Sequence, residues 1–194
     1  FAYALLGEVI RQASGTSYDE YIKKNILKKL RMANTFPDLN KKAKLLLANG
    51  YGRFIPNEKR EKFKHIPTNA YKPAAGFISN VDDLIKFTKA LYTNNSILSK
   101  NSLRLMINSA KKTGEEENTY GLGLSILKLK NKIIMGHTGG FPGFVTAMQF
   151  DPKNDISIVV LTNSIGDLNF RGIFEMIYAI ADNQKIYGLK RSKN

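Results

Sequence analysis

The chain has 194 residues, of which 43% are hydrophobic and 24% charged, a composition typical of a folded globular protein. Its net charge is +14, it has no cysteine and it has two histidines, which excludes a disulfide framework, a thiol nucleophile and a metal site built from Cys or several His. No apolar run approaches the roughly 20 residues that span a bilayer, so we expect no transmembrane segment.

The first residues, FAYALLGEVI, lie inside an apolar pattern and show neither an initiator Met nor a signal peptide. We therefore expect a longer chain, and we assign no localisation. Apolar residues recur at helical spacing over 1–14, and again from Ser17 to about Arg31. Gly15 suits the end of the first helix, and Ser17 with Glu20 forms a capping box at the start of the second. Both helices are expected to pack against a core.

Residues 34–73 are punctuated by Pro and Gly, which predicts a loop-rich segment of the kind that carries or covers a site. Within it, residues 41–72 are the densest basic stretch, with nine basic and two acidic side chains. Over the whole chain 23 of the 30 basic residues are Lys, whereas base readout and bidentate phosphate contacts favour Arg. We interpret the charge as a solvated surface and expect no specific nucleic-acid partner. Binding of anionic polymers remains an alternative.

After residue 73, two further helices are predicted before the periodicity becomes strand-like. Ser79 with Asp82 predicts the start of a helix, a short helix follows over about 100–108, and 111–118 predicts a polar loop. Residues 119–162 predict three antiparallel strands with turns at 130–132 and 151–154, and a last helix covers about 168–183. The middle strand is expected to begin with His137–Gly140 and to pair with the strand that follows 151–154. The fold class is therefore α+β, with a helical, loop-rich part over 1–110 and strands plus a closing helix over 111–194.

The segment from Gly136 to Phe144 has four glycines in nine residues and is the most unusual in the chain. Gly139 and Gly140 leave the backbone open to a ligand, a backbone N–H there could donate to an oxyanion, and His137 and Thr138 add polar side chains. The residues alone slightly favour the simpler interpretation, a Gly-rich strand turn with a packed histidine.

The sequence HTGGFPGF at 137–144, followed by FDP and IVVLTN, resembles the serine β-lactamase and penicillin-binding-protein superfamily, above all its class C-like branch. Residues 1–35, the stretch PAAGFISNVDDLIKFTKAL and the YGLGL stretch at 120–124 resemble further family segments, in the family's order, over about 1–182. The resemblance implies a β-lactamase/transpeptidase-like fold, an antiparallel sheet flanked by helices plus a helical region, incomplete at the N-terminus.

The resemblance also implies an acyl-enzyme hydrolase acting on a β-lactam, a D-amino-acid peptide or an ester. In the family a Ser-x-x-Lys motif supplies the nucleophile and its base, and a Tyr-x-Asn motif assists; both would precede the matched region. The resemblance assigns Gly140 N–H as an oxyanion donor and His137 as a source of positive potential or a hydrogen bond. Thr138, Gly139 and Phe141 would bind substrate. Because His replaces the usual Lys, ester and peptide substrates are favoured over β-lactams.

Literal copies of the family motifs inside the chain are in the wrong context, and we reject them as catalytic elements. They are Ser109–Lys112, Ser125–Lys128, Tyr92–Asn94 and Lys112–Gly114. We therefore expect the chain by itself to be inactive, with no metal or cofactor. The expected partners are a small-molecule or peptide substrate and either the missing N-terminal part or a second copy. A non-catalytic penicillin-binding-like module remains an alternative function.

Overall fold

The computed structural model describes residues 2–68, 71–113, 118–166 and 168–181. The helices are α1 (Ala2–Ser14), α2 (Tyr18–Ile22) with the π-helical turn η1 (Lys23–Leu27), α3 (Lys41–Leu46), α4 (Val81–Thr88) with η3 (Lys89–Thr93), α5 (Lys100–Asn108) and α6 (Phe170–Ala181). The strands are β1 (Lys111–Lys112), β2 (Thr119–Tyr120), β3 (Ser125–Leu129), β4 (Lys132–Phe141), β5 (Phe144–Asp151) and β6 (Ile156–Thr162).

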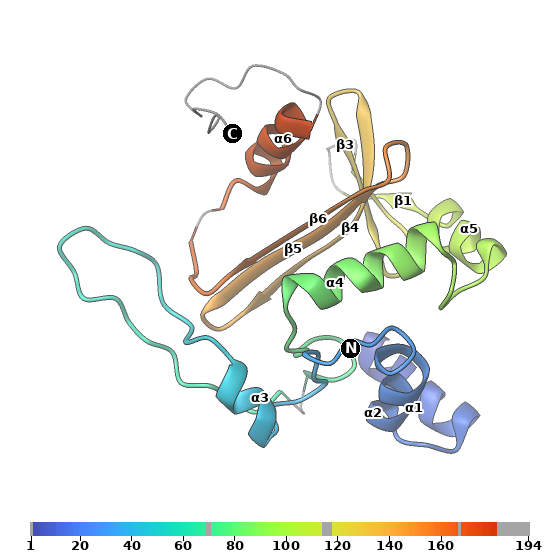
Figure 1. Ribbon diagram of the computed structural model, residues 1–194, viewed down its shortest axis with the longest axis horizontal. Helices are drawn as coiled ribbons and strands as arrows, with labels where there is room; N and C mark the ends of the chain where they lie inside the picture. The colour runs from blue at the N-terminus through green and yellow to red at the C-terminus, as the bar shows by residue number, and fades with distance from the viewer. Residues whose placement is uncertain (1, 69–70, 114–117, 167, 182–194) are drawn as a thin grey trace.

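The strands form one antiparallel sheet in sequence order, within the described part of the chain. Helix α6 covers one face and α4 lies against β5 and β6 on the other (Figure 1). The core under α6 is a cluster of apolar side chains from alternate strand positions and one helix face. Its buried members are Leu129, Ile134, Ala147, Ile158, Phe174 and Tyr178. The α+β fold with an antiparallel sheet flanked by helices is confirmed.

The prediction of three strands over 119–162 was wrong, because the range holds five: the short strand β2 precedes β3, and the expected middle strand is the hairpin of β4 and β5. Phe141 pairs with Phe144, so Pro142 and Gly143 form a two-residue turn, and Gly143 has φ +86°. Pro followed by a residue with positive φ is the sequence that a type II turn prefers. As a consequence His137–Gly140 lies in the second half of β4, and β6 pairs with β5 rather than with the strand that carries these residues.

The capping box of Ser17 and Glu20 is confirmed, with both reciprocal hydrogen bonds present. The expected start at Ser79 and Asp82 was wrong by one residue. The side chain of Asn80 accepts a hydrogen bond from the backbone N–H of Asp83 and begins α4. Ser79 is drawn into another contact, since its hydroxyl lies 2.8 Å from that of Thr35.

Two short elements lie in segments where loops were expected. Helix α3 begins at Asn40, whose side-chain oxygen accepts from Ala43 N–H at 2.9 Å. Strand β1 takes up Lys111 and Lys112, which pair with β2. Periodicity does not detect elements this short. The expected last helix is present as α6 up to Ala181; its predicted continuation to 183 lies outside the described residues.

Helix α1 forms as predicted, but its apolar face is not packed. Leu5, Leu6 and Val9 are exposed, and Gly7 is the buried residue of this helix. The expectation that α1 packs on a core was therefore wrong for this face, because no described segment covers it. Phe1 lies outside the described residues.

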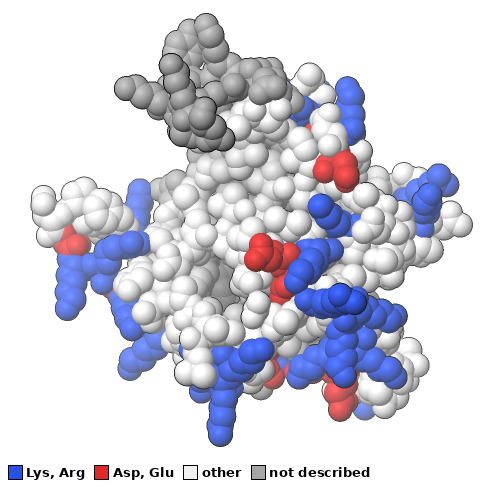
Figure 2. All heavy atoms as spheres, in the orientation of Figure 1, with Lys and Arg blue, Asp and Glu red and all other residues white. Residues whose placement is uncertain are grey.

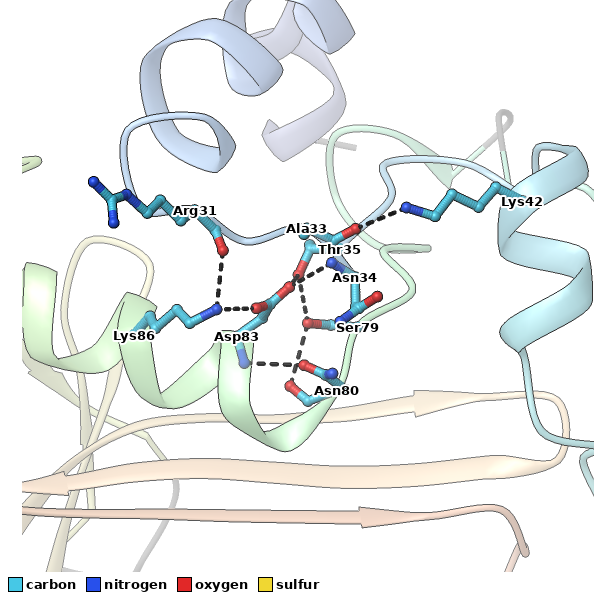
Figure 3. A network of polar contacts seen from close by, with 9 residues as sticks. All are labelled: Arg31, Ala33, Asn34, Thr35, Lys42, Ser79, Asn80, Asp83 and Lys86. Carbon is cyan, nitrogen blue, oxygen red and sulfur yellow. Dashed lines mark hydrogen bonds and ion pairs between the residues drawn. The ribbon is translucent and has the colours of Figure 1, made fainter.

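A buried carboxylate connects α4 to the segment before α3 (Figure 3). Asp83 is 1% exposed and accepts from Asn34 N–H at 2.8 Å and from the Thr35 hydroxyl at 3.0 Å. Lys86 Nζ lies 2.7 Å from the other carboxylate oxygen and also donates to the carbonyl of Arg31. Burial opposes ionisation, but the hydrogen bonds from Lys86, Asn34 and Thr35 outweigh it and lower the pKa of Asp83.

We predict that Asp83→Asn destabilises the protein by about 2 kcal/mol at pH 7, because charge-assisted hydrogen bonds to buried donors are lost. The folded-state pKa of Asp83 is depressed, so its contribution is present above the unfolded pKa of about 3.9 and is lost as the pH falls through the lower folded value. Urea unfolding at pH 7 and pH 3 should show the difference between variant and parent shrinking at pH 3. Asp82→Asn, exposed on the same helix turn, is the control and should change little. Equal effects of the two variants would contradict the prediction.

Candidate active site

The residues His137 to Phe141 form the end of β4 that extends beyond β3. Pairing between β3 and β4 stops at Ser125 opposite Gly136, whereas pairing between β4 and β5 continues to Phe141. Among the described strands, this end of β4 therefore has a partner on one side. Backbone groups on the other edge of a strand are open to a ligand.

A cavity of about 940 Å³ lies between the sheet and the helical, loop-rich part. On the sheet side it is lined by His137, Gly139, Gly140 and Phe141 together with residues of β5 and β6. The opposite wall comes from residues within 34–48, 64–68 and 73–84, and most of it is apolar. The structure thus brings four of the five predicted site residues to one cavity wall.

Thr138 is the predicted site residue that does not line this cavity. It pairs with Ala147. It lies four positions after Ile134 in β4, so the two side chains project from the same face of the sheet, and Ile134 is buried in the core under α6. Since successive side chains of a strand point to opposite faces, Thr138 lies on the α6 side, away from His137 and Gly139. Its side chain is exposed there.

The segment His137–Phe141 is called the box below, and its two glycines differ in the space around them. A Cβ on Gly139 would stand 2.7 Å from the Thr146 hydroxyl across the ladder, so a side chain would force this neighbour to move. Among the described residues no atom lies within 4 Å of the position that a Cβ on Gly140 would take. The backbone at Gly140 is therefore the more accessible of the two.

The His137 ring is held on both nitrogens. Nδ1 contacts the carbonyl oxygen of Thr138, and Nε2 lies 3.0 Å from the hydroxyl of Tyr120, whose ring meets the imidazole edge-on. A carbonyl only accepts, so Nδ1 donates, and in the neutral ring Nε2 then accepts from Tyr120. Burial, followed by the interaction between the Tyr120 and Tyr3 hydroxyls 3.4 Å apart, raises the pKa of Tyr120 to about 12, so this hydroxyl keeps its proton.

Tyr120 and Tyr3 are site residues that the sequence analysis missed. The YGLGL stretch that contains Tyr120 was used there only as a family segment. The connection lies in the register: Tyr120 of β2 pairs with Ser125 of β3, which pairs with Gly136, the neighbour of His137. Tyr3 comes from α1 and reaches Tyr120 across 117 positions of sequence. The sequence contained a signal for Tyr120, the YGLGL stretch, but it contained none for Tyr3.

Phe141 extends the apolar wall at the hairpin. Its ring meets that of Tyr71 edge-on, with centroids 5.3 Å apart. This contact joins the end of β4 to the loop-rich segment, and aromatic pairs of this geometry are favourable.

The rejected motif copies have structural roles. Ser125 lies in β3 and donates to the carbonyl of Gly136 at 2.9 Å, and Ser109 is the C-cap of α5. Tyr92 lies in η3 and stacks on Phe150 at 4.9 Å, where burial raises its pKa to about 12. Lys112 pairs in β1, and Gly114 lies outside the described residues.

Two further searches cover the described ranges alone. They contain no group of three or more His, Asp or Glu side chains that could hold a metal ion. None of their helices combines the length and the apolarity needed to cross a bilayer.

Comparison with known proteins gives matches along most of the chain. A family model described as Beta-lactamase matches residues 1–173. A penicillin-binding protein of Bacillus subtilis (strain 168) is 26% identical over 179 residues, which are 87% of this chain and 40% of that protein. The human serine beta-lactamase-like protein LACTB, mitochondrial, is 36% identical over 106 residues, 53% of this chain and 18% of that protein.

Solved structures of similar fold also match most of the chain. The octameric penicillin-binding protein homologue from Pyrococcus abyssi superposes with a TM-score of 0.75 and 27% identity, covering 94% of this chain and 41% of that one. The D-amino acid amidase from Ochrobactrum anthropi SV3 gives a TM-score of 0.79 at 23% identity, covering 93% and 56%. The chain thus spans about half or less of the length of the curated relatives and structures it matches.

We predict that Tyr120→Phe releases the His137 ring. The variant keeps the aromatic contact but loses the donor to Nε2, so the fixed Nδ1–H tautomer should give way to a mixture. Long-range ¹H–¹⁵N NMR of the imidazoles measures this, and His65→Asn assigns the two histidines.

The control for this prediction is Tyr71→Phe, which removes a hydroxyl from a ring that contacts Phe141 rather than His137. It should leave the His137 spectrum unchanged. A His137 spectrum that is identical in the parent and in Tyr120→Phe would show that Tyr120 does not set the tautomer.

Proposed function

The chain belongs to the beta-lactamase family, and we propose that it provides the His-Thr-Gly wall of a serine hydrolase active site. Members of this family are serine hydrolases with the same fold. The observation that carries the proposal is the box at the free end of β4, where His137, Gly139, Gly140 and Phe141 face one large cavity.

The nucleophile is proposed to come from residues outside these 194. The chain has no Ser-x-x-Lys or Tyr-x-Asn in the family's order, and the copies it does contain lie in a C-cap, a strand and a packed helix. The cavity beside the box measures about 940 Å³, which is enough for a small-molecule substrate.

The proposed reaction is acyl transfer in two steps. The serine oxygen attacks the substrate carbonyl carbon, the carbonyl π electrons move to oxygen, and the leaving group departs with a proton; water then releases the acyl group. Gly140 N–H would donate to the oxyanion that forms in each step. Support for this role comes from the open edge of β4 at this point and the open space around Gly140.

His137 would act through a hydrogen bond rather than as a permanent cation. Its ring has Nδ1 on a backbone carbonyl and Nε2 on a hydroxyl that stays protonated. Such a ring orients neighbouring groups without a fixed charge, whereas the family's usual lysine offers one. We therefore favour amide, peptide and ester substrates over anionic β-lactams.

The apolar cavity wall favours substrates with an apolar side group. Phe36, Leu39 and Phe77 line it opposite the box, and Phe141 lies at the hairpin end. A relative of the same fold is a D-amino acid amidase solved with L-phenylalanine amide, which agrees with an amino-acid derivative as substrate class. Gly139 and Phe141 are the proposed contact residues; Thr138 is left out because it lies on the other face.

Self-association is part of the proposal. The exposed apolar face of α1, formed by Leu5, Leu6 and Val9, is suited to contact with another polypeptide, either more of the same protein or a second copy. The penicillin-binding protein homologue from Pyrococcus abyssi is octameric.

A non-catalytic member that keeps the cavity as a binding module is the second candidate function, favoured by the missing nucleophile motif.

We predict that the purified 194-residue chain hydrolyses neither a chromogenic β-lactam nor p-nitrophenyl esters nor D-amino-acid p-nitroanilides. Product release at the rate of the buffer blank is the expected result. Turnover that disappears with Ser109→Ala or Ser125→Ala would show that the nucleophile lies inside the chain and would overturn the assignment.

In a form of the protein that does carry the nucleophile, we predict that Gly140→Pro lowers kcat by roughly 100- to 1000-fold, because one oxyanion donor is removed. The control is Gly140→Ala, which keeps the N–H and meets no described atom within 4 Å. Thermal unfolding of both variants separates loss of the donor from loss of the fold. Equal activity of the two folded variants would exclude Gly140 as the donor, and a competent form without turnover would favour the binding module.

A further inference from the structure

Residues 49–63 form a hairpin that projects from the body of the molecule (the cyan and teal loop in Figure 1). Its two arms are joined by hydrogen bonds from Gly52 N–H to the Glu61 carbonyl and from Phe63 N–H to the Gly50 carbonyl. The base is fixed to the end of the sheet, since Tyr51 exchanges backbone hydrogen bonds with Asn163 and Ile165. The hairpin is therefore anchored at its base, and its end, residues 53–60, is called the finger below.

The end of the finger carries two large apolar side chains in solvent. Phe54 is 65% exposed and Ile55 is 46% exposed. A turn closed by a hydrogen bond from Glu58 N–H to the Ile55 carbonyl holds them at the tip, with Asn57 at positive φ. Two adjacent apolar side chains exposed on a projecting turn are available for contact with a partner.

Basic residues surround this apolar tip. Residues 53–64 contain five basic side chains, Arg53, Lys59, Arg60, Lys62 and Lys64, against the acidic Glu58 and Glu61. Figure 2 shows the white end of the projection with blue side chains along it.

Arg60 has a structural task in the hairpin. It donates to the Gly52 carbonyl at 3.2 Å, contacts Ser164 and stacks over the Tyr51 ring. Lys59, Lys62 and Lys64 are exposed. The lysines are therefore the charges available to a partner.

We propose that the finger docks the protein on an anionic lipid surface. Phe54 and Ile55 would enter the boundary between headgroups and acyl chains, while Lys59, Lys62 and Lys64 lie among the lipid phosphates. The combination selects this partner. A soluble acidic polymer would use the lysines but leave the apolar tip in water, and a second copy of a chain with net charge +14 repels the same lysines.

The hairpin is continuous with the cavity wall. Lys64, His65 and Ile66, which directly follow the hairpin, are part of the cavity wall. The inference does not depend on the proposed function, because it is tested by binding alone.

The chain has no tryptophan, so Phe54→Trp introduces a single fluorescent probe at the tip. On vesicles of 30% phosphatidylglycerol in phosphatidylcholine its emission should shift to the blue, and on pure phosphatidylcholine it should not. Leu105→Trp is the matched control, since Leu105 is 62% exposed on α5, away from the finger, and its emission should stay unchanged.

Sedimentation with the same vesicles measures affinity. We expect the double variant Phe54→Ser, Ile55→Ser to bind at least tenfold more weakly at unchanged charge, and Lys59→Gln, Lys62→Gln to lose binding more strongly at low salt than at high salt. The charge-matched control is Lys111→Gln, Lys153→Gln. No blue shift, or equal binding of parent and double Ser variant, would overturn the proposal. The proposal would also be overturned if the protein bound soluble polyphosphate more tightly than vesicles and the Ser substitutions left that binding unchanged. This result would indicate an acidic polymer as the partner.

Discussion

The buried carboxylate of Asp83 is the constraint on which the position of the cavity wall depends. It fixes the backbone of Asn34 and the hydroxyl of Thr35 to α4, which itself packs on β5 and β6. Next to it, Phe36 and Ile78 exchange two backbone hydrogen bonds, and both residues line the cavity. Asp83 thus holds the loop wall to α4, and α4 in turn packs on the sheet, so the two walls of the cavity are positioned relative to each other.

The backbone of the sheet wall is accessible because the neighbouring strands β3 and β4 differ in length. β4 continues past the end of β3, so the box from His137 to Phe141 keeps one free edge while β5 holds it straight. β2, one strand further away, places Tyr120 against the histidine in this gap. A strand paired on both sides would have its backbone N–H and C=O groups engaged in the sheet and closed to a ligand.

The sequence by itself determined the class of fold and indicated a segment that lines the cavity. Helical and alternating periodicities follow from local geometry, and the cap formed by Ser17 and Glu20 needs residues three apart. The order of motifs around HTGGFPGF was enough to assign the family, and four of the five residues expected at the site do line one cavity. The periodicities and the cap are encoded within a few residues, and the order of motifs can be read along the chain, so none of these features needs a tertiary structure.

Tertiary structure decided what depends on contacts across the sequence. Asn80 rather than Ser79 begins α4, because Thr35 engages the Ser79 hydroxyl from 44 positions away. The packing of α6 on the sheet decides which face of β4 turns away from the cavity, and Thr138 lies on that face with Ile134. Tyr3 enters the histidine network from another element altogether. Periodicity gives the faces of an element, but only packing decides which face meets which partner.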